Sequence, residues 1–451
     1  MKYFLLLFIW VLGIHYAYPQ HLKFDVANTK ENKAILYSMS GEKASFVDSI
    51  FASSGGLFIS QTKDKIIHDG IYRLTFGNKW IDFVSDRQEV ELSTESDNIA
   101  DSLRVIKSES NKLYFSFLKL NKEYKTKSEL LQLILFQYPK DDAYYTQTKK
   151  RLTDLQSEYL EFVNITAQKN PDSFIAKYIR SSQLPVTDLS IQPEEQLNYL
   201  KIHALDFVDF NNSQLIYSDV FTNKTIEYLT YFRNPQLQLP QLEKAFMSAV
   251  DSILNRAKVN QLVYQHITEY LIDGFKKFGF DKVLDYIVGN YVIKDDLCLD
   301  VKTEGLIKRR IDQAKIFRIG NSVPNISLTD ISGRLVNLEN IDAAKTLIVF
   351  YASWCPHCKE ILPKLNNLKK SKIGNELEVL AVSLDAKKED WTSFAKSKCP
   401  DLVNICDLKG WNGKVLKDYY IYATPTMFLV DKGKRIIGKP MTFEDVQKLI
   451  R

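Results

Sequence analysis

The stretch LIVFYASWCPHCK at positions 347–359 decides the fold and the chemistry of the C-terminal part of this chain. Its first half is apolar, β-branched or aromatic, which is typical of a buried strand. Directly after that strand come Cys355 and Cys358, with Pro356 at the first turn of a predicted helix. Two cysteines with this spacing at a helix N-terminus indicate thiol–disulfide chemistry.

The start of a helix favours the ionised form of a cysteine. Unpaired backbone N–H groups and the helix dipole stabilise negative charge there, so the thiol loses its proton more easily. We therefore predict that Cys355 is the attacking thiolate and that Cys358, one turn further on, is the shielded resolving thiol. His357 is expected to stabilise the thiolate, and Trp354 to shield one side of the disulfide. The alternatives are a solvent-facing His357 with little effect and a Trp354 that only packs in the core.

The other cysteines argue against a zinc site. A zinc ribbon needs a second Cys-x-x-Cys pair, and Cys298, Cys399 and Cys406 do not form one. The six histidines are scattered. We therefore expect no metal, and no cofactor other than the redox-active disulfide Cys355–Cys358.

The remaining cysteines are expected to stay unpaired. A predicted strand at 402–405 would hold Cys399 and Cys406 more than about 10 Å apart, whereas a disulfide needs Cα atoms roughly 4.4–6.8 Å apart. Cys406 is either a buried structural residue or a third thiol near the active site, since it ends a predicted parallel strand. We expect Cys298 to be buried and inert.

The overall composition is that of an ordinary globular protein with several domains. The chain has 451 residues, and its net charge of +5 comes from 60 basic and 55 acidic residues, a balance that does not indicate nucleic acid binding. Residues 1–18 have the pattern of a signal peptide, because Lys2 precedes an apolar run that is too short for a membrane span of about 20 residues. No cysteine follows that run, so we do not expect a lipoprotein. An uncleaved anchor is the alternative.

Three further regions differ in their hydrophobic pattern. Residues 19–108 contain short alternating segments separated by turn signals, which predicts an antiparallel β-sandwich. In that domain His68 and Asp69 are expected to be solvent-exposed turn residues. Residues 109–316 have helical periodicity, and their many aromatic residues predict core packing, with a substrate groove as the minor alternative. Residues 317–451 alternate strands with helices and close with a hairpin, which predicts an α/β fold.

The C-terminal region, about 135 residues long, resembles the thioredoxin superfamily, and within it the periplasmic TlpA/ResA-like branch. The matching residues are the motif at 354–358, the helix proline Pro363, and the segment Ala423-Thr424-Pro425-Thr426 before the hairpin. The resemblance implies a cis bond between Thr424 and Pro425 beside the two cysteines. It also implies that Thr424 and Pro425 bind an extended substrate, which pairs by strand addition. Residues 19–108, through patterns such as Gly56-Leu57-Phe58 and Asp69-Gly70-Ile71-Tyr72, resemble a β-domain of unknown function found in Bacteroidota proteins.

The resemblance implies a function as well as a fold. It points to an exported thiol–disulfide oxidoreductase in the periplasm or cell envelope of a Gram-negative bacterium, with protein thiols and disulfides as substrates and a membrane electron donor or acceptor as partner. Two positions depart from relatives. Thioredoxin has a buried Asp where this chain has Val349, and ResA-type reductases have a Glu where it has Ile361, with Glu360 adjacent. A route for removing the proton of Cys358 is therefore not visible in the sequence.

The direction of electron flow stays open. The Pro-His dipeptide matches the strong oxidant DsbA, whereas the other motifs match reductases. Reduction potentials of such proteins run from about −270 mV for thioredoxin to about −120 mV for DsbA. We favour a reductase or isomerase over a disulfide-donating oxidase. A binding or scaffold protein with a thioredoxin-like module is the main alternative from another class, and a peroxiredoxin is a weaker one.

Overall fold

The computed structural model describes residues 21–53, 55–61, 68–86, 88–187, 192–371 and 376–450, so the predicted signal peptide at 1–18 lies outside the described residues. The chain divides into two compact units. One consists of Met1–Pro235 with Asp251–Ile267, and the other of Gln236–Val250 with Thr268–Arg451. The helical region predicted at 109–316 therefore contributes to both units.

The first unit begins with two four-stranded sheets, ordered β4-β1-β7-β8 and β3-β2-β5-β6. The strands are β1 (His21–Ala27), β2 (Lys33–Ser40), β3 (Lys43–Phe51), β4 (Leu57–Gln61), β5 (Gly70–Phe76), β6 (Lys79–Ser85), β7 (Val90–Glu95) and β8 (Arg104–Lys107). Alternate side chains from both sheets meet in one apolar core. The strand pairs are antiparallel except β1 with β7, which run parallel. The chain reaches β7 only after crossing the other sheet, and such a crossover permits a parallel pair.

The prediction for His68 and Asp69 was wrong, because both residues are half-buried. The ring of His68 stacks on Tyr217 with 3.5 Å between ring centroids, and its Nε2 lies 3.0 Å from Ser38 Oγ. Burial lowers the pKa of His68. A turn pattern does not reveal that η2 (Ser213–Tyr217), far along the chain, packs on β2 and β5.

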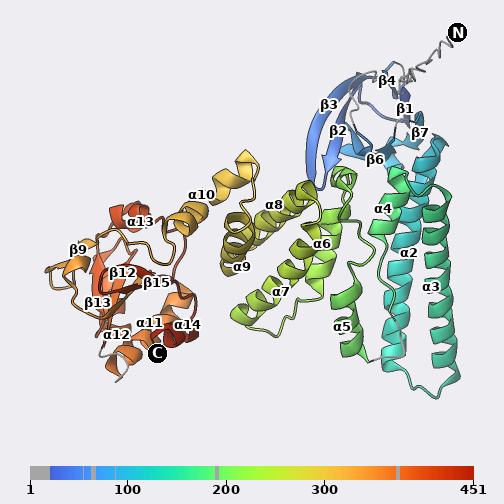
Figure 1. The fold of residues 1–451 in the computed structure, drawn as a ribbon. Coiled ribbons are helices and arrows are strands. Elements are labelled where there is room, and N and C mark those ends of the chain that lie inside the picture. The colour runs from blue at the N-terminus through green and yellow to red at the C-terminus, as the bar shows by residue number, and fades with distance from the viewer. Residues whose placement is uncertain are drawn as a thin grey trace, which may run out of the picture. The chain divides into compact units, whose positions relative to one another are not determined.

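Two long helices, α2 (Glu109–Gln137) and α3 (Ala143–Lys169), lie side by side in the first unit (Figure 1). The shorter elements are η1 (Ser96–Asn98), α1 (Ile99–Ser102), α4 (Phe174–Ser182), α5 (Pro193–His203) and α6 (Val220–Thr230). Helix α2 is fastened to β6 by Asn111, whose side chain accepts from Val84 N and donates to Val84 O, both at 2.8 Å. The Asn111 side chain thus forms the two backbone hydrogen bonds with Val84 that a neighbouring strand would otherwise form.

The helical part of the chain then continues across the division between the units. Its elements are α7 (Leu239–Ala257), α8 (Gln261–Lys277), α9 (Asp281–Ile287), the π-helical segment η3 (Val288–Ile293) and α10 (Val301–Ile316). Helices α7 and α8 contribute residues to both units. Within the second unit Phe246, Phe275 and Phe280 form an aromatic cluster that packs α7, α8 and the start of α9 together.

The C-terminal domain of the second unit is built on a five-stranded sheet with the order β13-β12-β11-β14-β15. Its strands are β11 (Lys345–Tyr351), β12 (Leu377–Ser383), β13 (Val403–Cys406), β14 (Thr426–Asp431) and β15 (Ile436–Gly438). The first three are parallel and the last two antiparallel, as the alternating pattern and the closing hairpin predicted. A small hairpin, β9 (Ser327–Thr329) and β10 (Leu335–Asn337), precedes them.

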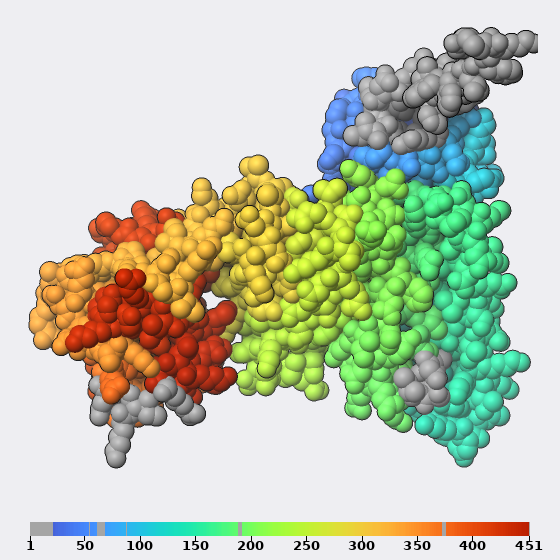
Figure 2. Space-filling view, viewed as in Figure 1, coloured from blue at the N-terminus to red at the C-terminus, as the bar shows by residue number. Residues whose placement is uncertain are grey.

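Helices cover this sheet and leave its central strand buried. They are α11 (Pro356–Lys370), α12 (Lys388–Lys398), α13 (Lys414–Asp418) and α14 (Phe443–Ile450), with the short turns η4 (Leu338–Asn340) and η6 (Gly410–Asn412). The C-terminal residues, coloured red in Figure 2, lie on the surface of this domain, where α14 contacts α11. Residues 346–351 of β11 are all buried, which explains their unbroken apolar character. The predicted order of N-terminal sheets, a helical region and a C-terminal α/β domain is confirmed.

Replacing Asn111 with alanine should cost about 2–4 kcal/mol in the free energy of unfolding, because it leaves both polar backbone groups of Val84 without their buried partners. Urea titration followed by circular dichroism measures the loss. The exposed Asn223, whose side chain bonds Asp219 at the start of its own helix, is the matched control. Equal stability of Asn111→Ala and Asn223→Ala would contradict this role.

Candidate active site

The two cysteines lie where strand β11 passes into helix α11. Cys355 is the N-cap residue of α11, and Pro356 occupies the first turn, where its missing N–H costs little. The backbone N–H of Cys358 donates to Cys355 Sγ at 3.4 Å. The first sulfur thus occupies the position of a capping oxygen, where backbone donors stabilise a negative charge.

The two thiols have opposite acidities. The pKa of Cys355 is lowered to about 5 by a hydrogen bond from the Cys358 thiol, by the Thr424 side chain, by the Cys358 N–H and by the charge of His357. Burial raises the pKa of Cys358 far above its usual range, since this side chain is completely inaccessible to solvent. At neutral pH the pair therefore consists of one thiolate and one thiol.

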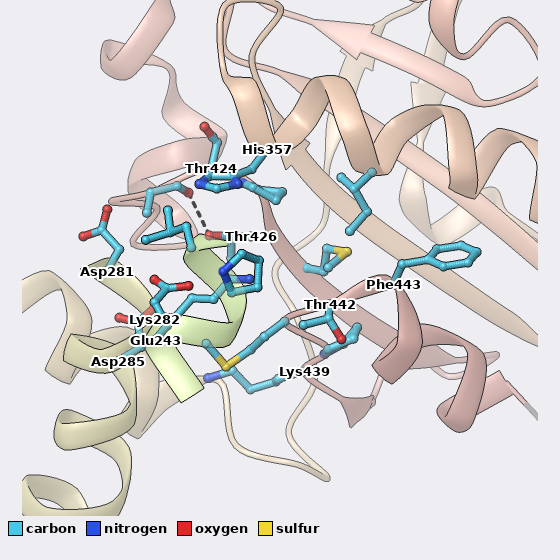
Figure 3. A pocket seen from close by; sticks show the side chains of 18 of the residues that line it. Glu243, Asp281, Lys282, Asp285, His357, Thr424, Thr426, Lys439, Thr442 and Phe443 are labelled. Atoms are coloured by element: carbon cyan, nitrogen blue, oxygen red, sulfur yellow. Dashed lines mark hydrogen bonds between the residues drawn. The ribbon is translucent and has the colours of Figure 1, made fainter. Parts of the chain in front are cut away.

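The segment before β14 lies against the first cysteine. The Thr424–Pro425 bond is cis, as predicted. Cys355 Sγ lies 3.3 Å from the carbonyl oxygen of Thr424, and Thr426 Oγ1 donates to the Ala423 carbonyl at 2.8 Å, the bond drawn as a dashed line in Figure 3. The predicted substrate-binding residues Thr424 and Pro425 therefore lie beside the predicted nucleophile.

A buried carboxylate supports the loop that carries Cys355. Asp385, which follows the C-terminal end of β12, accepts hydrogen bonds from the backbone N–H of Ser353 at 3.2 Å and from its hydroxyl at 2.7 Å. Ser383 Oγ donates to the same carboxylate at 2.7 Å. Asp385 was not predicted from the sequence. Its position just past a parallel strand was the available signal, because such strand ends meet at one edge of a sheet.

The other residues that were considered for the site differ in how far they are exposed to solvent. His357 is half-buried, and Trp354 is 56% exposed. Cys406 is buried, and its hydrogen bonds involve Ser383, Asp385 and Leu408 rather than the redox pair.

The remaining two cysteines are unpaired. Cys399 is buried, which raises its pKa to about 11. The prediction for Cys298 was wrong, because this thiol is exposed. It lies in the irregular segment between η3 and α10, where the neighbouring Leu297 takes the buried position.

A pocket of about 500 Å³ adjoins the redox pair (Figure 3). His357, Thr424 and Pro425 line it from the C-terminal domain, and Glu243 of α7 and Asp285 of α9 line it from the helical part of the same unit. Glu243 is almost fully buried, and burial raises its pKa, opposed by Lys282 and His357. No motif marked Glu243 or Asp285, because each lies in an ordinary helical pattern.

Within the described part of the chain, no group of three or more His, Cys, Asp or Glu side chains has the arrangement of a metal site. None of the helices among the same residues combines the length and the apolar character that a membrane span requires.

Comparison with known proteins shows what the domain that carries this site is similar to. Residues 319–438 match the AhpC/TSA family. The thiol-disulfide oxidoreductase ResA of Bacillus thuringiensis subsp. konkukian is 28% identical over 122 residues, which cover 26% of this chain and 67% of that protein. ResA of Geobacillus kaustophilus is 29% identical over 133 residues, covering 29% of this chain and 75% of that protein. The solved structure of a thiol-disulfide oxidoreductase from Bacteroides fragilis is 26% identical and covers 28% of this chain and 96% of that chain, with a TM-score of 0.27.

The family match and the relatives confirm that the C-terminal domain is thioredoxin-like and related to ResA-type proteins. They also confirm the predicted enzyme class, a thiol–disulfide oxidoreductase.

The alkylation rate of Cys355 by iodoacetamide should fall with decreasing pH with a midpoint at about 5, because only the thiolate reacts. Since Cys298 is exposed, the measurement needs a Cys298→Ser background. Thr424→Val and His357→Ala should each move the midpoint to higher pH, because each removes a group that stabilises the thiolate. A midpoint near that of an ordinary thiol, about 8.5, in the parent protein would contradict this assignment.

Proposed function

We propose that this protein is an exported thiol–disulfide oxidoreductase that reduces or isomerises protein disulfides through the redox pair of Cys355 and Cys358. The observation that carries the proposal is the placement of two sulfurs within one helical turn. Cys355 caps α11 and its Sγ lies 3.4 Å from the backbone nitrogen of Cys358, whose own side chain is completely buried. A thiolate poised beside a protonated thiol suits a cycle in which one sulfur attacks and the other resolves.

In the reductive cycle, the Cys355 thiolate attacks one sulfur of a substrate disulfide. That disulfide bond breaks, a bond forms between Cys355 Sγ and the attacked sulfur, and the leaving thiolate takes a proton from water. Cys358 then loses its proton and attacks Cys355 Sγ, which releases the second substrate thiol. Two electrons have moved to the substrate, and the enzyme holds the Cys355–Cys358 disulfide. In isomerisation a second substrate thiolate displaces Cys355 instead.

Removal of the Cys358 proton needs a base or water. The positions where relatives carry acidic residues hold the buried apolar side chains of Val349 and Ile361. Glu243 and Glu360 are carboxyls that line the pocket beside His357. Of the two, Glu243 is the buried one, and burial raises the pKa of its carboxyl, which suits a group that accepts a proton.

The acidity of Cys355 bears on the direction of electron flow. A stabilised thiolate favours the reduced enzyme and makes its disulfide more oxidising. Thioredoxin combines a thiol pKa of about 7 with a potential of about −270 mV, and DsbA combines about 3.5 with about −120 mV. The pKa of about 5 for Cys355 lies between the thiol pKa values of these two proteins.

The proposed location is the periplasm or cell envelope of a Gram-negative bacterium. It rests on the apolar run that follows Lys2 and on the small number of cysteines, five in the whole chain. A reductase or isomerase in an oxidising compartment needs a supply of electrons. We therefore propose a membrane protein as its electron donor.

Cys358→Ser should accumulate a mixed disulfide between Cys355 and substrate, because the second step of the cycle is blocked. Cys355→Ser should form no such adduct and should lose disulfide reduction altogether. Non-reducing gel electrophoresis of the variants with a disulfide-containing peptide distinguishes them. Retention of the physiological function by Cys355→Ser would instead favour a binding or scaffold protein.

The reduction potential of the pair should lie between about −230 and −150 mV, on the relation between thiol pKa and potential. Equilibration in glutathione buffers followed by thiol alkylation measures it, with Cys298→Ser to remove the exposed thiol. A potential at or below about −270 mV would identify a dedicated reductase, and one near −120 mV a disulfide donor.

A further inference from the structure

The pocket beside the redox pair has a second wall that a thioredoxin-like domain alone does not supply. One wall consists of His357 and the segment 422–427 of the C-terminal domain. The opposite wall consists of α7, α9 and η3, which contribute Glu243, Asp285 and Gly289. Figure 3 shows Glu243 and Asp285 of the helical wall on the side of the pocket opposite Thr442 and Phe443. Both walls belong to the same compact unit.

A charge cluster around the buried guanidinium of Arg310 connects the helical wall to the segment that precedes Thr424. Arg310 of α10 donates hydrogen bonds to the carboxylates of Asp281 and Asp285. The Tyr422 hydroxyl donates to Asp285 Oδ1 at 2.6 Å, and the Arg310 guanidinium lies 4.1 Å from the centre of the Tyr422 ring. The Arg310 side chain is only 12% exposed. Separating these groups would leave charges buried without partners, which is costly.

A second attachment lies one turn further along α10. The buried side chain of Gln313 donates from Nε2 to the carbonyl oxygens of Tyr419 and Tyr420, at 3.0 and 3.3 Å. Gln313 and Arg310 together hold residues 419–422, which lead directly into Thr424 and Pro425. These contacts therefore connect the helical wall, through α10, to the segment that carries Thr424.

The helical wall limits the size of a ligand that can reach Cys355 through this pocket. A volume of about 500 Å³ is within the usual range for a site that encloses a small molecule. It accommodates a few residues of extended polypeptide but not the convex surface of a folded domain. Thr424, whose carbonyl lies 3.3 Å from Cys355 Sγ, is at the edge of this space. A chain that occupies the pocket would therefore hold a neighbouring disulfide close to Cys355.

We infer that this pocket binds the extended segment that flanks the substrate disulfide, so that the substrates are flexible peptides and unfolded chains rather than disulfides in folded surfaces. The inference rests on the proposed function and narrows its substrate class. The lining suits such a ligand, because Met427 and Phe443 offer apolar contacts while Glu243 and Lys439 offer polar ones. Lys439 lines the pocket, and its ammonium group lies 5.9 Å from the centre of the Phe428 ring.

Gly289 offers a way to fill the pocket from the helical wall. A Cβ atom added at this position meets no other atom within 4 Å, and the residue lies far in sequence from the redox machinery. Gly289→Trp should therefore raise KM for a disulfide-linked peptide of about eight residues by about tenfold or more, equivalent to about 1.4 kcal/mol of binding. Gly289→Leu should give a smaller increase and provides a second variant in case tryptophan prevents folding.

The matched control is Gly305→Trp on α10, where an added Cβ also meets nothing and which does not line this pocket. All variants carry Cys298→Ser, and each is tested with the peptide, with a small aromatic disulfide, and with a folded protein that has a surface disulfide. We expect Gly289→Trp to impair only the peptide reaction, and the parent enzyme to reduce the peptide faster than the folded protein.

The outcomes separate the two proposals. If Gly289→Trp and Gly305→Trp reduce the peptide equally well, the pocket is not the binding site and the inference is wrong. A parent enzyme that reduces the folded protein as fast as the peptide overturns the substrate class. If the parent enzyme exchanges none of the three disulfides, the proposed function itself fails.

Discussion

The chemistry of this protein depends on one electrostatic constraint, a sulfur atom held against the amide N–H groups at the start of α11. The N–H of Cys358 points at Cys355 Sγ, and the sulfur replaces the oxygen that usually caps a helix. Negative charge is therefore stabilised on Cys355. It is not stabilised on Cys358, because that side chain lies one turn further on in an apolar interior, where burial raises its pKa. The central strand β11 is buried along its length and fixes where that helix begins.

The surrounding structure keeps the sulfur in this geometry. Asp385 holds Ser353, two residues before the nucleophile, and Thr424 contacts the nucleophile from the other side. The Thr424 segment is held in turn by α10, through Arg310 and Gln313. The helical residues of the second unit are therefore part of the redox site. They line the pocket through which a ligand would reach Cys355, whereas the motif at 354–358 contains the two sulfur atoms.

Local patterns predicted where the two cysteines and the cis-proline segment lie relative to one another. The strand and the two cysteines are neighbours in sequence, and the proline before β14 was predicted from the family resemblance. The structure brings them together as expected. Predictions that depend on distant partners did less well. The turn predicted around His68 was wrongly expected to be exposed, because the sequence near it contains no sign of Tyr217. The apolar neighbours of Cys298 predict a buried thiol, but Leu297 occupies the interior instead.

The sequence by itself determined the class of fold at the C-terminus and marked Cys355 and Cys358 as the candidate redox pair, because a buried strand, a helix start and a cysteine spacing are local properties of the chain. Only the tertiary structure decided how that pair is approached. Asp285 and Tyr422 are 137 positions apart, and Gln313 lies 106 positions from Tyr419. Contacts over such separations form through the packing of whole elements, and single residues in ordinary helical patterns do not reveal them.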